Sequence, residues 1–205
     1  MINTSILASR AKSLNAKVGA ITLALAAFLT LLLSHFSQPL APLRLFTLAL
    51  TAFAAWSFCD EMGMRKPLNR AGFVFFAVAL ASKVQISLGV AAELVGRYYL
   101  LYAVFLLAAM QFWSVAFLHR QRTLKVVGAV GVLTSLAPII ILVVGHVALG
   151  AGALLGVGAI LSATAGAAPV DLTFITLIER LFGFWGYFTA WLLWRGHIQS
   201  QALPQ

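Results

Sequence analysis

The chain contains one cysteine, Cys59, among its 205 residues. A single cysteine cannot form an internal disulfide, a cysteine-rich metal site or a CxxC redox pair. The sequence therefore excludes a dithiol oxidoreductase.

Charged side chains are also scarce, because they make up 9% of the residues whereas hydrophobic residues make up 62%. Soluble domains contain about 25% charged and about 45–50% apolar residues. The 14 basic residues exceed the 5 acidic ones, but they lie in short groups beside apolar segments, where anionic lipid headgroups are nearer than any nucleic acid. The composition predicts an integral membrane protein whose partners include membrane lipids and exclude nucleic acid.

Six apolar stretches predict an all-α, polytopic membrane bundle with six transmembrane helices, since about 20 helical residues cross a hydrocarbon core of about 30 Å. No convincing cleavage site follows the first stretch, so we interpret it as a retained helix. Gly96 and Arg97 are predicted to form a tight hairpin between the third and fourth spans. The six spans cover residues 18–36, 43–59, 71–95, 98–118, 126–147 and 173–194 of one transmembrane domain, 1–205.

The Gly/Ala-rich segment 150–169 is interpreted as interfacial or re-entrant, and a seventh span is the alternative. Asp171 is the candidate N-cap of the last helix. The runs 20–27, 77–82 and 145–158 are rich in small residues, which favour close helix contacts within the chain or in a homo-oligomer.

Lys and Arg alternate between the two sides of these spans, with ten on one side and Arg44 and Arg97 on the other. The positive-inside rule then places both termini in the cytoplasm and the protein in the inner (cytoplasmic) membrane as a multi-pass protein. Aromatic belts are predicted at both interfaces. They consist of Trp56, Trp113, Trp191 and Trp194 on the cytoplasmic side and Tyr98, Tyr99 and Tyr102 on the outer side.

Several ionisable residues fall inside the predicted spans, where each needs a partner, a wet cavity or an interface. Lys83 is expected near the middle of the third span, and Glu179 and Arg180 about two turns into the last, at a similar depth. Two cations and one carboxylate could hold an anionic group such as a phosphate or carboxylate. A structural salt bridge between the two helices is the alternative. The candidate binding residues are Lys83, Glu179, Arg180, Gln85 and Gln111, with Thr134 and Ser135 as further neutral members.

His35 and His146 are predicted at similar depth near the outer surface, which makes them weak candidates for ligands of haem b or of a metal ion. Neither has a partner at ligand spacing. Glu93 and Arg97 are spaced as a local surface ion pair. Pro138 should kink the fifth span and release a carbonyl.

Three functions follow as hypotheses. The first is a small membrane protein that binds or transports an anionic or amphipathic molecule or lipid at the charged cluster. The second is a noncatalytic accessory or assembly subunit of a larger membrane complex. The third, an intramembrane enzyme acting on a lipid or quinone, is the least favoured because the chain contains no GxSG, HExxH or paired-aspartate motif.

Overall fold

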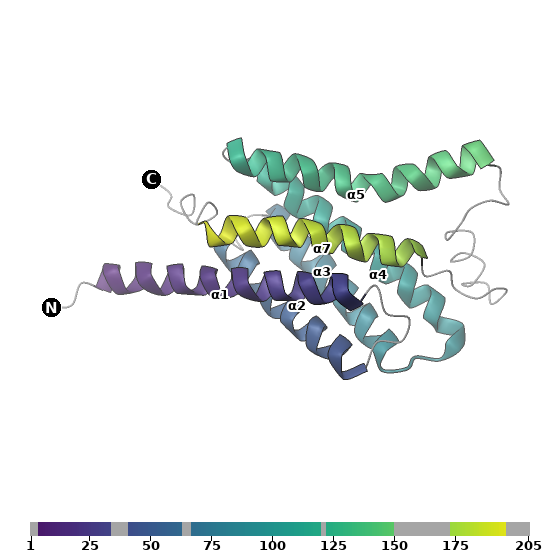
Figure 1. Cartoon of the computed structure of the whole chain (residues 1–205), viewed down its shortest axis with the longest axis horizontal. Coiled ribbons are helices and arrows are strands. Elements are labelled where there is room, and N and C mark those ends of the chain that lie inside the picture. The colour runs from purple at the N-terminus through teal and green to yellow at the C-terminus, as the bar shows by residue number, and fades with distance from the viewer. Residues whose placement is uncertain (1–3, 34–40, 63–66, 120–121, 150–172, 196–205) are drawn as a thin grey trace.

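A computed structural model describes residues 4–33, 41–62, 67–119, 122–149 and 173–195. Within these ranges the chain forms six helices and no strand (Figure 1), which confirms the all-α fold class. The helices are α1 (Thr4–Leu33), α2 (Ala41–Met62), α3 (Pro67–Ser87), α4 (Ala92–Leu118), α5 (Arg122–Leu149) and α7 (Thr173–Trp194).

The observed helix bounds match the predicted apolar stretch closely for α7, near the C-terminus, and less closely for α1, near the N-terminus. Helix α7 begins and ends where the sequence predicts, whereas α1 begins at Thr4, well before the apolar stretch that starts at residue 18. The helix continues through the basic segment because Ala, Leu, Lys and Arg are all good helix formers. Hydropathy detects only the apolar part of such a helix.

The turn between α3 and α4 corrects the predicted hairpin at Gly96 and Arg97. Helix α3 ends at Ser87, and Gly89 has a φ of 83°, a conformation that costs a residue with a Cβ about 1–2 kcal/mol. The Gly89 N–H donates to the Ile86 carbonyl at 3.3 Å, which closes the turn. Hydropathy does not reveal this turn, because the residues around Gly89 are mostly hydrophobic like those of the flanking helices. Gly96 and Arg97 instead lie in the first turns of α4.

The helices form a closed ring in which α1 packs against α2 and α7, α3 packs against α2 and α4, and α5 packs against α4 and α7. Helices α4 and α7 also contact each other across the bundle. Helices α1 and α7 are therefore neighbours, and the start of α1 lies at the same end of the bundle as the end of α7 (Figure 1).

Small residues bring these helices close together, as their number in the sequence suggests. A Cβ added to Gly19 would lie 2.8 Å from Cβ of Ser57 on α2, and one added to Gly183 would lie 3.4 Å from the Ala27 carbonyl oxygen on α1. Ala20 and Ala27 are buried. Close approach of backbones is a common way for membrane helices to gain packing contacts.

An aromatic cluster fills the core between α3, α4 and α7. The ring of Trp113 lies 5.4 Å from that of Phe76 and 6.1 Å from that of Trp185, and Phe182 lies 6.1 Å from Trp185, all measured between centroids. Trp113 is only 2% exposed. Its assignment to an interfacial belt is wrong, because its face of α4 is turned toward α3 and α7.

Helix α5 contains Pro138 and is bent near its middle (Figure 1), as the sequence predicts. Proline has no N–H to donate to the residue four positions earlier, which here is Thr134. The Thr134 hydroxyl donates to the Val130 carbonyl at 2.6 Å.

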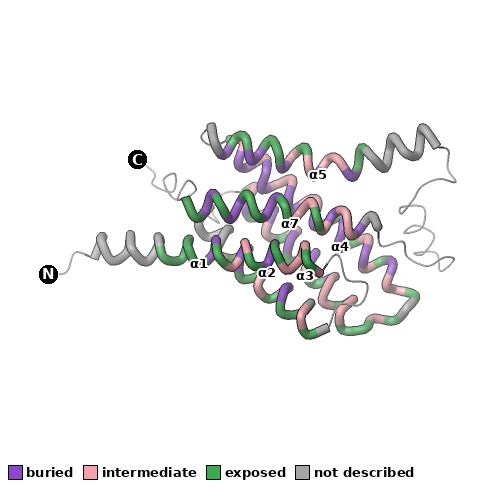
Figure 2. The backbone as a smooth tube through the Cα atoms, viewed as in Figure 1, coloured by how far each residue is buried: buried purple, intermediate pink, exposed green. Residues whose placement is uncertain are grey.

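Two helices, Pro67–Ser87 and Glu93–Leu118, are long and apolar enough to cross a membrane within the part of the chain that the structure describes. Shorter apolar helical pieces span Lys17–Leu33, Leu45–Ser57 and Leu124–Ile140. Many residues on the surface of the bundle are exposed (Figure 2), and a large share of them carry large apolar side chains. They occur on every helix and include Phe28, Phe53, Val74, Val104, Leu133 and Phe184.

Candidate functional site

Lys83 and Glu179 form an ion pair that joins α3 to α7, and Nζ of Lys83 donates to Oε1 of Glu179. The Lys83 and Glu179 side chains are 13% and 16% exposed, so the ion pair is largely buried. The structure confirms that these two residues meet. Lys83 lies about one turn from the end of α3, not near the middle of a span as predicted, because the turn at Gly89 ends the helix early.

Two tyrosine rings of α4 complete the surroundings of the Lys83 ammonium group. Nζ lies 5.5 Å from the ring centroid of Tyr99 and 4.7 Å from that of Tyr102, within range of cation–π attraction. Both tyrosines are buried, so their assignment to an outer aromatic belt is wrong. Their spacing of three residues puts both on the face of α4 that is turned toward Lys83.

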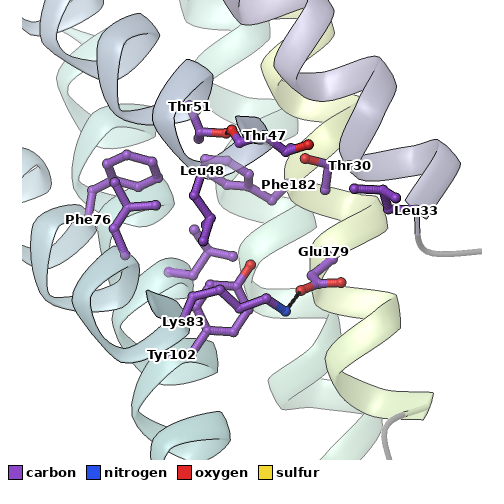
Figure 3. A pocket seen from close by; sticks show the side chains of 12 residues that line it. Thr30, Leu33, Thr47, Leu48, Thr51, Phe76, Lys83, Tyr102, Glu179 and Phe182 are labelled. Atoms are coloured by element: carbon purple, nitrogen blue, oxygen red, sulfur yellow. Dashed lines mark hydrogen bonds and ion pairs between the residues drawn. The ribbon is translucent and has the colours of Figure 1, made fainter. Parts of the chain in front are cut away.

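The ion pair lines a partly open pocket to which five helices contribute side chains (Figure 3). The volume open to a water-sized sphere is about 80 Å³, which is room for several water molecules or for the polar end of a larger molecule. Most of the wall is apolar. The lining residues are Thr30, Leu33, Thr47, Leu48, Thr51, Phe76, Leu80, Lys83, Tyr102, Leu106, Glu179 and Phe182.

Three threonines form the polar part of the wall contributed by α1 and α2. Thr30 donates to the Ala26 carbonyl at 2.8 Å, Thr47 to the Leu43 carbonyl at 2.8 Å and Thr51 to the Thr47 carbonyl at 2.7 Å. Each hydroxyl proton is thus used within its own helix, and the hydroxyl oxygens remain as acceptors. The ammonium group of Lys83 carries three donors, and one of them is used in the hydrogen bond to Glu179. Lys83 is therefore the main hydrogen-bond donor that the pocket offers to a ligand.

Phe76 and Phe182 both line the pocket and stack with their centroids 5.8 Å apart. Two further voids share Thr51 and Phe182 with the pocket, and each has a volume of about 10 Å³. A void of this size holds at most about one water molecule. The aromatic cluster therefore bounds the pocket on the side of the bundle core.

The remaining predicted binding residues lie elsewhere. Arg180 and Gln85 are exposed and are not among the lining residues of the pocket, and Gln111 accepts a hydrogen bond from Ser135, which joins α4 to α5. Neighbouring residues on a helix point about 100° apart, so Arg180 cannot share the direction of Glu179. Among the described side chains the pocket therefore contains one cation and one carboxylate, and the predicted second cation lies outside it.

The candidate metal and haem ligands fall outside the part of the chain whose side chains the structure describes. His35 and Asp171 lie outside the described residues, as does the segment 150–169, and the side chain of His146 is likewise not described. The described residues contain no group of three or more His, Cys, Asp or Glu side chains that could hold a metal ion. Glu93 and Arg97 are both exposed near the start of α4.

Sequence reasoning missed the tyrosines and threonines of the pocket. The signal was present, because Thr47 and Thr51 are one turn apart on α2, as Tyr99 and Tyr102 are on α4. Single threonines and tyrosines are common in apolar helices, however, and only the structure shows that Thr47, Thr51 and Tyr102 line one pocket with Lys83 and Glu179.

Comparisons with protein-family models, curated proteins and solved structures find no match to this chain.

Proposed function

We propose that the chain is a multi-pass protein of the inner membrane, with six spans and both termini in the cytoplasm. The apolar exterior supports this proposal, because a soluble monomer rarely exposes a large contiguous apolar patch. The alternation of basic residues supports the orientation. Nζ of Lys17, near the first apolar stretch, lies 6.0 Å from the ring centroid of Trp194 at the end of α7, which is consistent with both termini lying on one side.

Cysteine labelling tests the topology. The chain has a single cysteine, so the substitution Cys59→Ser gives a cysteine-free protein into which single cysteines can be introduced. We expect a membrane-impermeant maleimide to label Leu88→Cys in sealed right-side-out vesicles, because the α3–α4 turn faces outward. Leu14→Cys and Lys125→Cys should be labelled only after the vesicles are opened. All three positions are exposed. Labelling of Leu88→Cys and Lys125→Cys from the same side would show that α4 does not cross the membrane.

We further propose that the pocket binds the polar end of an anionic or amphipathic molecule, with the apolar part of the ligand against the leucine and phenylalanine walls. The observation that carries this proposal is the Lys83–Glu179 pair, which lines an open pocket and is not sealed inside a packed core. A carboxylate or phosphate accepts hydrogen bonds from the ammonium donors of Lys83, and the threonine oxygens can accept from a ligand hydroxyl. Binding is favoured over passage through the bundle, because the voids beyond the pocket are of water size.

Native mass spectrometry of the full chain in mild detergent tests the pocket. We expect a bound amphiphile on the wild-type protein, either retained from the membrane or added as a fatty acid or phospholipid. Leu80→Trp should reduce its occupancy at least about tenfold, because Leu80 lines the pocket and the larger ring fills it. Leu101→Trp is the matched control, since Leu101 lies exposed on α4. Equal occupancy in both variants would place the ligand elsewhere, and no bound species with any added lipid would contradict a binding function.

A further inference from the structure

A second concave site lies on the outside of the bundle, between the first and last helices. It is a groove with a volume of about 260 Å³. Its floor contains Ala20 and Ala190, both buried, and Ala24. Small side chains at these positions leave the space open. The walls are the larger side chains of Ile21, Tyr187, Trp191 and Trp194.

Two cations flank this groove, and each is held against one of its own walls. Nζ of Lys17 lies 6.0 Å from the ring centroid of Trp194, and Cζ of Arg195 lies 5.2 Å from that of Trp191. Neither cation forms an ion pair with any of the described carboxylates. Their charge is therefore available to an anion, while their contacts with the rings restrict their positions.

We infer that this groove is a binding site for an anionic phospholipid, with one acyl chain along the alanine floor and the phosphate near Lys17 and Arg195. The site is separate from the Lys83–Glu179 pocket, with which it shares no lining residue. The inference rests on the proposed membrane location, which cysteine labelling tests independently.

The shape and the charge of the groove together favour a lipid. Its apolar part extends from Ala24 toward Lys17, about 10 Å along α1 at 1.5 Å per residue. The cations lie at the end predicted to face the cytoplasm, where anionic lipid headgroups attract Lys and Arg. Tryptophans are typical of the same level of the bilayer. A zwitterionic lipid would fill the apolar part equally well but would gain less from the two positive charges.

Lipid titration of the purified full chain, followed by native mass spectrometry, tests this inference. We expect phosphatidylglycerol to bind more tightly than phosphatidylcholine and to bind less tightly as ionic strength rises. The double variant Lys17→Gln/Arg195→Gln should weaken phosphatidylglycerol binding about 30-fold, which is about fivefold per cation. Arg97→Gln is the control for loss of one exposed positive charge outside the groove, and it should leave phosphatidylglycerol binding unchanged.

A variant that fills the groove separates a lipid site from simple surface charge. Ala24→Phe should reduce phosphatidylglycerol binding while leaving Lys17 and Arg195 in place, and it should elute from gel filtration like the wild type. If Ala24→Phe binds phosphatidylglycerol normally, or if Arg97→Gln weakens binding as much as the double variant, the groove is not the lipid site. Conversion of a wild-type dimer to a monomer by Ala24→Phe, with phosphatidylglycerol binding unchanged, would show that a second copy occupies the groove and would overturn the inference.

Discussion

Lys83→Met alone should lower the free energy of unfolding by about 3 kcal/mol, measured by denaturant unfolding in detergent micelles. The substitution leaves the Glu179 carboxylate in a largely buried site without its cation, and removal of one partner from a buried pair typically costs about 3–5 kcal/mol. The pocket is partly open, which places our value at the lower end of that range. Glu179→Leu alone should be destabilising for the same reason, because it leaves the ammonium group unneutralised.

The double variant Lys83→Met/Glu179→Leu should recover most of the lost stability, since replacement of both charges by apolar groups of similar volume is often neutral. Such recovery corresponds to a coupling free energy between the two positions of about 2 kcal/mol or more. Arg97→Gln, which removes an exposed charge, should change stability by less than about 0.5 kcal/mol. Additive effects of the two single substitutions would show that the residues do not interact.

The same variants separate a structural from a functional role of the pair. A pair that serves only to join α3 to α7 is dispensable in the stable double variant. A pair that binds the polar end of a ligand is required for binding. The double variant should then fold normally but lose the bound amphiphile. Retention of the amphiphile by this variant would contradict the proposed role of Lys83 and Glu179 in binding.

Gly128→Ala should lower the free energy of unfolding by about 2–3 kcal/mol, a typical cost of overpacking. A Cβ at this position of α5 would lie 2.6 Å from the Ser114 carbonyl oxygen and 2.9 Å from the Leu118 backbone nitrogen, both on α4. Backbone atoms of a helix cannot move individually, so α4 and α5 would have to separate. Thermal unfolding in detergent, followed by circular dichroism, measures the effect.

Gly186→Ala is the matched control for this substitution, since it also changes a buried helical glycine. Its Cβ would lie 3.8 Å from the nearest atoms, on Leu23 and Ala27, which is ordinary contact. Alanine is a better helix former than glycine by up to about 1 kcal/mol, so Gly186→Ala should be neutral or stabilising. A similar loss in both variants would mean that the α4–α5 contact is not as close as the structure shows.

The fold class and the meeting of Lys83 with Glu179 were both predictable from the sequence. An apolar chain offers few other partners for two buried side chains of opposite charge. They are expected to pair with each other, because an unpaired buried charge is costly. The bounds of α7 were also predictable, since the apolar run begins and ends with the helix. The turn at Gly89 was not predictable, because hydropathy does not depend on whether a residue adopts a positive φ.

The remaining members of the pocket required the structure, because the position of a residue along a helix does not specify the direction in which its side chain points around the helix. Arg180 and Glu179 are adjacent in sequence and similar in depth, yet only Glu179 faces the pocket. Tyr99 and Tyr102 matched an interfacial belt by position, and only the packing of α4 against α3 and α7 shows that they surround Lys83.

The sequence by itself determined that this protein is helical, that most of its side chains are apolar and that its few internal charges must pair, because these properties follow from composition and from the cost of burying charge. The tertiary structure decided which faces of the helices meet, and with them the pocket around Lys83 and Glu179 and the groove between α1 and α7. The physical reason is that both sites are spaces between helices distant in sequence, and their shape depends on how closely glycine and alanine let those helices approach.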